Sequence, residues 1–237
     1  MSGRENYGIH APTVVRNLGS IGAILLSSSV LSRHWHILEW LAPTMVFVGL
    51  SMVAMSLWML ISSLWLKRFV LRRLLDAHRW RGDEIVLDLG CGRGLVAIGA
   101  ARRVPSGKVL AIDLWQDVDL SGNTPEALTA NAQAAGVADR VRVETGDARS
   151  LPYPDASFDV VASMTVIHNI PDEPGRAAAV AEAWRVTKPG GQILIFDIRH
   201  ARAYLRQLRG LGATEVALSW PILLWGMLGW RFAVTKP

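Results

Sequence analysis

Two kinds of apolar pattern divide this chain. From Trp40 to Leu66 there are 27 consecutive residues without a charge, enough for one membrane-spanning helix at about 1.5 Å per residue. An earlier uncharged run, Asn17–Ser32, has 16 residues and carries two glycines and five serines. After Gly82 the apolar residues come instead in short β-favouring runs that alternate with helical patterns. This alternation predicts an α/β domain with a largely parallel sheet covered by helices on both faces.

The two N-terminal runs predict a helical hairpin over residues 17–66 that anchors the protein in a membrane. The stronger span is expected at residues 40–66, and the turn of the hairpin at residues 32–39. Two other interpretations remain open. Residues 40–66 match a helix buried inside a soluble domain, and Ser27–Ser29 resembles a signal-peptide cleavage site.

The net charge of +5 is unevenly distributed along the chain. Residues 67–81 balance at +5, residues 82–200 at −5 and residues 201–237 at +4. A basic cluster directly after a membrane span favours the cytoplasmic side and attracts anionic lipid. We therefore expect residues 67–81 to form a basic juxtamembrane helix and residues 1–16 to be a cytoplasmic segment. A nucleic-acid enzyme would carry its basic residues around the site itself, so membrane lipids are the expected partners and nucleic acid is not.

The most informative run is residues 85–94, Ile-Val-Leu-Asp-Leu-Gly-Cys-Gly-Arg-Gly. A β-favouring stretch leads into Asp88 and Leu89, and a helical pattern begins at Leu95. Between them lie three glycines at every second position, Gly90, Gly92 and Gly94. Strand, glycine turn and helix in this order are typical of a nucleotide site, because glycine lets a ligand lie against the main chain. The G-x-G-x-G spacing differs from the G-x-G-x-x-G of dinucleotide-binding proteins.

Further strands and helices are predicted after this turn. The first strand after it ends in Asp113, an acid 23 residues after Gly90, where a carboxylate accepts hydrogen bonds from ribose hydroxyls. The strands are expected at residues 108–113, 140–145, 158–163, 192–197, 213–219 and 231–235. The helices are expected at residues 95–104, 125–135, 174–187 and 199–211. An apolar connector, Trp220–Trp230, joins the last two strands.

The order of these motifs resembles that of the class I S-adenosylmethionine-dependent methyltransferases, especially the branch of small-molecule and quinone-ring methylating enzymes. The resemblance covers about residues 82–237, the expected methyltransferase domain. It rests on residues 85–94, Asp113, Gly146-Asp147-Ala148 and Lys188-Pro-Gly-Gly191. The expected fold is therefore α/β, a Rossmann-like sheet of seven strands, mostly parallel with an antiparallel C-terminal hairpin. One or two transmembrane helices are expected to precede it.

The resemblance implies S-adenosylmethionine as the cofactor and assigns residues to it. Asp88 corresponds to the residue that holds the amino end of the methionine moiety through water, Asp113 to the ribose ligand and Asp147 with Ala148 to the adenine ligands. Capping of the turn by Asp88 and an Asx turn at Asp147 are the structural alternatives. The full expected set is Asp88, Leu89, Gly90, Cys91, Gly92, Gly94, Asp113, Leu114, Asp147, Ala148 and Ser163. The single cysteine, Cys91, excludes a disulfide framework, and no metal site is expected.

Fewer residues suggest the chemistry of the acceptor. His168 follows the fourth strand and is the candidate acid or base, with a purely positioning role as the alternative. Trp115, Gln116, Tyr153 and Asn169 lie in loops at the same sheet edge and are expected either to line the acceptor pocket or to pack. The long loop at residues 114–124 predicts a lid whose acids and tryptophan cover the adenosine, with a merely elaborate entry into the next helix as the alternative.

The leading functional hypothesis is a membrane-anchored methyltransferase in the cell membrane, with its catalytic domain on the cytoplasmic side and a small or lipophilic acceptor. A short-chain NAD-dependent oxidoreductase would need a Tyr-x-x-x-Lys pair, which the chain lacks. A cofactor-binding sensor or scaffold without turnover remains an alternative. The connector Trp220–Trp230 is expected to dip into the bilayer through Leu223, Leu224 and Trp225, so that a lipophilic acceptor enters laterally. Packing of this connector on the protein's own sheet or anchor is the competing interpretation.

Overall fold

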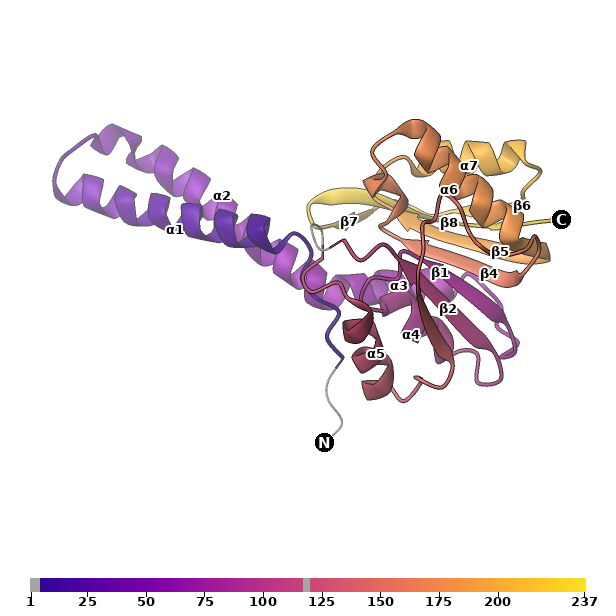
Figure 1. The fold of residues 1–237 in the computed structure, drawn as a ribbon. Coiled ribbons are helices and arrows are strands. Elements are labelled where there is room, and N and C mark those ends of the chain that lie inside the picture. The colour runs from indigo at the N-terminus through magenta and orange to yellow at the C-terminus, as the bar shows by residue number, and fades with distance from the viewer. Residues whose placement is uncertain (1–4, 117–119) are drawn as a thin grey trace.

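A long helical hairpin projects from an α/β domain in the computed structural model, which describes residues 5–116 and 120–237 (Figure 1). The hairpin consists of α1 (Pro12–His34) and α2 (Ala42–Ile61), joined through a short 3₁₀ turn, η1 (Glu39–Leu41). The two helices approach closely where glycines face each other. A Cβ built on Gly22 would lie 2.8 Å from the Gly49 carbonyl oxygen, so neither position has room for a side chain.

α2 continues into the domain as one long helical run. A π-helical turn, η2 (Ser62–Leu66), links it to α3 (Lys67–Leu75). The apolar face of α3 carries Leu71 and Leu75, which lie against Gly99 of α4 (Leu95–Ala101). The basic segment expected after the anchor is thus a helix whose apolar face packs on the domain.

Two of the helical runs, Pro12–His34 and Glu39–Leu75, are long and apolar enough to cross a membrane. Only 17% of the most apolar stretch of each is buried within the molecule. A core helix of a soluble domain would be largely covered by the rest of the domain. Within this single chain the two helical runs are therefore not buried core helices. α1 begins at Pro12, five residues before the expected span, because a proline is favourable in the first turn of a helix.

The sheet has the strand order β3-β2-β1-β4-β5-β8-β6, with β7 paired to β8. β1 to β5 run parallel, and β8 is antiparallel to β5, β6 and β7, so the antiparallel C-terminal part is confirmed. The strands are β1 (Ile85–Leu89), β2 (Lys108–Asp113), β3 (Val141–Thr145), β4 (Phe158–Met164), β5 (Thr187–Asp197), β6 (Thr214–Leu218), β7 (Ile222–Leu224) and β8 (Met227–Thr235). Within residues 5–116 and 120–237, the sheet therefore has one strand more than the seven expected.

The additional strand comes from the connector, which was expected to be irregular. β7 turns into β8 at Trp225-Gly226, and both residues have positive φ, 51° and 81°. Two positive φ values in a two-residue loop are those of a type I′ turn, which matches the twist of a β-hairpin. Leu224 and Trp225 are buried, so the expectation that they reach the bilayer is wrong. The exposed apolar residues of this ribbon are Trp220, Leu223, Met227 and Leu228.

Two hydrophobic clusters lie on the two faces of the sheet. α3, α4 and α5 (Pro125–Ala134) contribute to one, and α6 (Glu173–Val186) and α7 (Ala201–Gly210) contribute to the other. Side-chain caps fix where two helices begin. Thr124 Oγ1 accepts from the Ala127 N–H at the start of α5, and Asp172 Oδ1 accepts from the Gly175 N–H at the start of α6.

Candidate functional site

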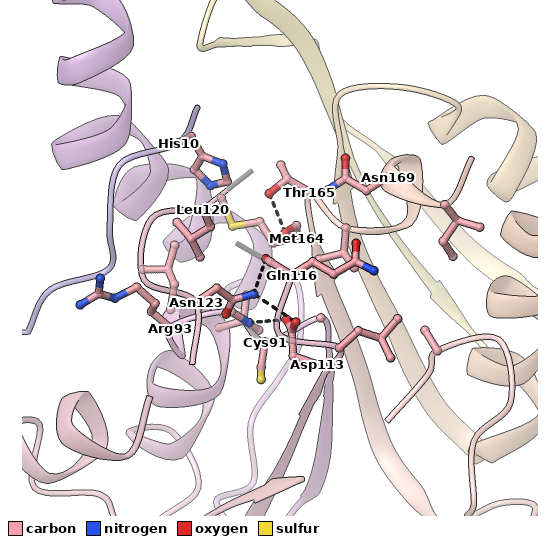
Figure 2. A pocket seen from close by; sticks show the side chains of 18 of the residues that line it. His10, Cys91, Arg93, Asp113, Gln116, Leu120, Asn123, Met164, Thr165 and Asn169 are labelled. Atoms are coloured by element: carbon pink, nitrogen blue, oxygen red, sulfur yellow. Dashed lines mark hydrogen bonds between the residues drawn. The ribbon is translucent and has the colours of Figure 1, made fainter. Parts of the chain in front are cut away.

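A cavity of about 290 Å³ lies at the carboxyl ends of β1, β2 and β4 (Figure 2). Strand ends in a parallel sheet meet at one edge, which is where ligands bind in open α/β folds. Many of the expected cofactor residues line this cavity: Gly90, Cys91, Gly92, Asp113, Leu114, Asp147 and Ala148. The expected acceptor residues Gln116 and Asn169 line it as well.

The glycine turn forms the floor of the cavity. Gly90, Gly92 and Gly94 have φ values of 72°, 52° and 86°, a region that residues with a side chain rarely adopt. The N–H groups of Gly90 and Cys91 both donate to the Ile112 carbonyl oxygen at 2.9 Å, which ties the turn to the end of β2. At Gly90 a Cβ would lie 2.2 Å from Val166 Cγ1, so the turn and the loop after β4 are in direct contact.

Asp88 is fully buried behind the turn and does not line the cavity. Its Oδ2 accepts from the Ala97 N–H at 2.8 Å at the start of α4, whereas its Oδ1 has no hydrogen-bond partner. Burial raises the pKa of Asp88 to about 8, and the nearby Asp113 carboxylate adds to this. Asp88 therefore caps the turn at the start of α4, as the structural alternative predicts. Its unpartnered oxygen remains available to water or to a cationic group.

Asp113 is fixed by three donors from the protein. Its Oδ2 accepts from the Gly92 N–H at 2.8 Å, and its Oδ1 accepts from the Trp115 N–H at 2.7 Å and from Asn123 Nδ2 at 3.2 Å. An ionised carboxylate has about four acceptor positions, so room for one more donor remains. Asn123 also donates to the Gln116 carbonyl oxygen and lines the cavity (Figure 2).

Asp147 lies in the cavity, but its carboxylate is paired with Arg149. The guanidinium donates to both oxygens, from Nε at 2.9–3.0 Å and from Nη2 at 2.7 Å. These charge-assisted bonds lower the pKa of Asp147. The Arg149 N–H also donates to Asp147 Oδ1, which is the Asx-type contact that the sequence leaves as an alternative.

Four expected cofactor residues do not line the cavity: Asp88, Leu89, Gly94 and Ser163. Ser163 is buried, and its hydroxyl donates to the Leu89 carbonyl oxygen at 3.0 Å, joining β4 to β1. The residues after it, Met164, Thr165 and Val166, form the wall in its place. Because successive side chains in a strand point to opposite faces, a shift of one residue decides which of them reaches a ligand.

Two of the expected acceptor residues have packing contacts instead. Trp115 Nε1 donates to Thr145 Oγ1 at 2.9 Å, and Tyr153 donates its hydroxyl proton to Glu144 Oε2 at 2.8 Å. Neither lines the cavity. In the predicted lid, Leu120 lies over Gly92, where a Cβ would come within 2.9 Å of its Cδ2. The two acids of that loop, Asp117 and Asp119, lie outside the described residues.

His168, the candidate acid or base, lies beside the main cavity and not in its wall. Its Nδ1 is 2.5 Å from Oδ1 of the buried Asp197, a close contact without the alignment of a hydrogen bond. The His168 backbone N–H donates to Asp197 Oδ2 at 3.1 Å. The ring lines a smaller cavity of about 100 Å³ that adjoins the first.

The remaining wall comes from residues that the sequence did not predict. Tyr7 and His10 belong to the extended residues 5–11, which we call the N-terminal strap. Figure 2 shows the His10 ring entering the cavity from the strap, near the wall that carries Thr165. Trp225, at the β7–β8 turn, packs against His10 with ring centroids 3.8 Å apart and ring planes tilted by 41°.

Lys67 holds the strap against the domain. Its ammonium group donates to the carbonyl oxygens of Tyr7 at 2.8 Å and Gly8 at 2.7 Å, and the residue is 3% exposed. Asn6 exchanges two hydrogen bonds of 2.8 Å with the side chain of Asn131 on α5. The only sequence signal for this arrangement is the position of Lys67 as the first charge after the apolar run.

Cys91 is buried in the glycine turn. Burial, with Asp88 and Asp113 nearby, raises the pKa of its thiol. The side chain is therefore a neutral thiol at physiological pH, and a thiolate nucleophile is not available from it.

Residues 86–191, a little under half of the chain, match the family model described as a methyltransferase domain. A 27-O-demethylrifamycin SV methyltransferase of Amycolatopsis mediterranei is 38% identical over 117 residues, 49% of this chain and 39% of that protein. A demethylmenaquinone methyltransferase of Deinococcus radiodurans is 35% identical over 113 residues, 47% of this chain and 42% of that protein. The chain thus spans less than half the length of these relatives.

Solved structures have the same fold at low identity. The cyclase SpnF superposes with a TM-score of 0.60 at 20% identity, covering 72% of this chain and 80% of that one. A geranyl diphosphate methyltransferase in complex with GPP and sinefungin gives 0.54 at 16% identity, covering 71% and 78%. At such identities the likeness shows the fold alone. The superposed part of the chain is longer than residues 86–191, and more than a quarter of the chain lies outside it.

Proposed function

We propose, on the premise that residues 86–191 are an S-adenosylmethionine-dependent methyltransferase domain, that this protein is a membrane-anchored methyltransferase with a small lipophilic acceptor. The observation that carries the proposal is the composition of the cavity wall. One side is the glycine turn with Asp113, and the other is formed by Lys67, His10 and Trp225, which flank or contact the apolar hairpin. The wall opposite the donor residues is therefore built from segments next to the base of the apolar hairpin.

The residues present fit S-adenosylmethionine. The unpartnered Asp88 Oδ1 lies behind the glycine turn, where it suits an ammonium group reached through water. Asp113 retains acceptor capacity for ribose hydroxyls, and the Ala148 main chain borders the cavity beside Asp147 for an adenine ring. When bound, this cofactor supplies an electrophilic methyl group. The chain's own task is to hold the acceptor in line with that group and to exclude water.

The membrane assignment rests on the surface of the hairpin. At about 1.5 Å per residue, α1 and α2 each reach about 30 Å or more, the thickness of a hydrocarbon core. Their exposed side chains include Phe47, Leu50 and Leu57. On the neighbouring ribbon Trp220 is 90% exposed, and tryptophan favours the membrane interface. Cleavage of a signal peptide at residues 27–29 would remove the strap and most of α1, and with the strap Tyr7 and His10 of the cavity wall.

We expect Asp113→Ala to weaken binding of S-adenosylmethionine by about 5- to 150-fold, because a charged hydrogen-bond acceptor is worth about 1–3 kcal/mol. Isothermal titration of the purified full-length protein in nanodiscs measures this. Asp139→Ala is the matched control, since Asp139 is an exposed acid remote from the cavity and should leave affinity unchanged. Equal affinity of the Asp113 variant and the wild type, or tight binding of NAD, would contradict the donor assignment.

We expect the hairpin to cross the membrane twice, with the strap and the α/β domain on the cytoplasmic side. In a Cys91→Ala background, a membrane-impermeant maleimide should label His36→Cys, in the hairpin turn, on intact spheroplasts. It should label Ser106→Cys, an exposed residue of the domain, only after lysis. The basic residues at 67–81 set this orientation. Labelling of Ser106→Cys on intact spheroplasts would refute the orientation, and protection of both positions would refute the double crossing.

A further inference from the structure

The smaller cavity is built from parts of the chain that are far apart in sequence. It has a volume of about 100 Å³ and shares His10, Thr165, Asn169 and Trp225 with the larger cavity. The two spaces are therefore neighbours around the same four residues. Residues from the base of the hairpin, the strap, the loop after β4 and the C-terminal ribbon line the smaller one.

One side of this cavity is apolar and belongs to the elements next to the anchor. Met59 comes from the last part of α2, and Met227 begins β8. Met227 is 36% exposed, so the cavity wall continues onto the molecular surface there. Met55, one helical turn before Met59, lies close to Gly226 of the ribbon. Flexible thioether side chains adapt to ligands of irregular shape.

The opposite side is polar and is held rigidly. Asp197 is fully buried and contacts both the ring and the backbone N–H of His168. With Nδ1 directed at Asp197, Nε2 is the ring nitrogen left for a ligand. Thr165 has a positive φ of 58°. Asn169 is the last residue of a short 3₁₀ helix that precedes α6. A β-branched residue at positive φ is strained, and such strain persists where the surrounding structure enforces it.

Ser63 connects the two sides at the π-helical turn. Its hydroxyl oxygen accepts from the Trp225 indole N–H at 3.0 Å and from the His10 backbone N–H at 3.3 Å. This single buried side chain therefore positions the ring pair His10–Trp225 between the cavities. π-helical turns inside α-helices are frequent at functional sites.

We propose that this smaller cavity is the subsite for the acceptor's reactive headgroup, and that the acceptor's apolar tail leaves it past Met59 and Met227 toward the bilayer. The inference rests on the proposed function, and it adds where the acceptor headgroup binds and how large that headgroup can be. A cavity of about 150 Å³ in a protein core holds one benzene ring. The headgroup is therefore no larger than a single small ring, and its polar substituent faces His168 and Asn169.

The test uses the full-length protein in nanodiscs of phosphatidylcholine and phosphatidylglycerol, with a 4-dodecylphenol that carries a diazirine in the chain next to the ring. On illumination, we expect cross-links in the peptides that contain Met59 and Met227, competed by unlabelled 4-dodecylphenol. Met59→Trp and Met227→Trp fill the cavity from its apolar side, and each should lower the cross-linking by about tenfold or more. Met227 is partly exposed, so its variant tolerates the larger side chain if the Met59 variant does not fold.

Leu57→Trp is the matched control, because Leu57 lies on the same helix but faces outward, and its cross-linking should equal that of the wild type. Cross-links that both tryptophan variants leave unchanged, or that fall only on outward positions such as Leu57, would overturn the subsite. Titration of S-adenosylmethionine on the same samples keeps the two claims separate. If the wild type does not bind S-adenosylmethionine, the proposed function is refuted, whatever the cross-links show.

A second comparison tests the polar side. Dodecylbenzene lacks the hydroxyl group, so it should compete about tenfold less well than 4-dodecylphenol in the wild type. In His168→Leu the two competitors should become nearly equal, because the hydrogen-bonding partner is gone. An unchanged difference between the competitors in this variant would show that His168 does not receive the headgroup.

Discussion

Gly90→Ala is expected to weaken donor binding strongly and to destabilise the protein. The backbone at Gly90 has a positive φ of 72°, and a left-handed conformation costs a residue with a side chain about 1–2 kcal/mol. The new methyl group would also lie within 2.8 Å of three side-chain atoms of Val166. Val166 is β-branched and cannot swing away easily. Overpacking of this kind costs a further about 1–3 kcal/mol.

The two costs together predict a fall of about 2–5 kcal/mol in the free energy of unfolding. Val166 also lines the cavity, so its displacement enters the donor site. Affinity for S-adenosylmethionine should fall by about 10- to 100-fold or more. Denaturant unfolding and isothermal titration, both on the full-length protein in nanodiscs, measure the two effects.

Gly136→Ala separates the backbone cost from the steric one. Gly136 has a similar φ of 67°, and nothing lies within 4 Å of a Cβ built on it. This control should lose only about 1–2 kcal/mol of stability and keep its donor affinity. If Gly90→Ala behaves as Gly136→Ala does, the glycine turn is not in contact with the donor and the site is misplaced.

The local part of the site was predictable from the sequence. The run at residues 85–94 and the acid at Asp113 lie close together in the chain, and their conformation follows from glycine and strand patterns. The alternation of strands and helices after them predicts the largely parallel sheet, though not the order of its strands. The place of β7 was not predicted, because a type I′ turn at Trp225-Gly226 lacks the usual Asn-Gly or Asp-Gly signal.

Side-chain roles at the cavity rim were harder to predict. Ser163 and Met164 are neighbours in β4, yet only Met164 reaches the cavity. Tyr153 and Trp115 lie at the expected edge but satisfy their polar groups with Glu144 and Thr145. The sequence specifies that these loops meet at one edge, whereas tertiary packing decides which side chain faces the ligand.

The second wall of the site was not predictable from local patterns. The strap contacts residues more than fifty positions away, through Lys67 and Ser63. Trp225 reaches the same place from the far end of the chain. A basic residue after an apolar run indicates membrane orientation. That pattern does not indicate that the Lys67 side chain is buried and binds the carbonyl oxygens of the strap. Only the folded hairpin, strap and ribbon together create this wall.

Transfer of a methyl group to a membrane-resident molecule is the central claim, and label transfer tests it most directly. Full-length protein in nanodiscs is incubated with methyl-tritiated S-adenosylmethionine and a lipid extract of the source organism. The cavity joins a donor site to the base of an apolar hairpin, so label should pass into the organic phase on one species heavier by a single CH₂ unit. The Asp113→Ala variant should transfer much less at a donor concentration near the wild-type dissociation constant.

A water-soluble metabolite extract serves as the matched acceptor control and should take up no label. Label found only in a water-soluble product would contradict the lipophilic acceptor. Tight donor binding with no transfer to either extract would contradict the enzymatic account and favour a sensor or scaffold. The account predicts a tritiated, organic-soluble product that appears with the wild type and depends on Asp113.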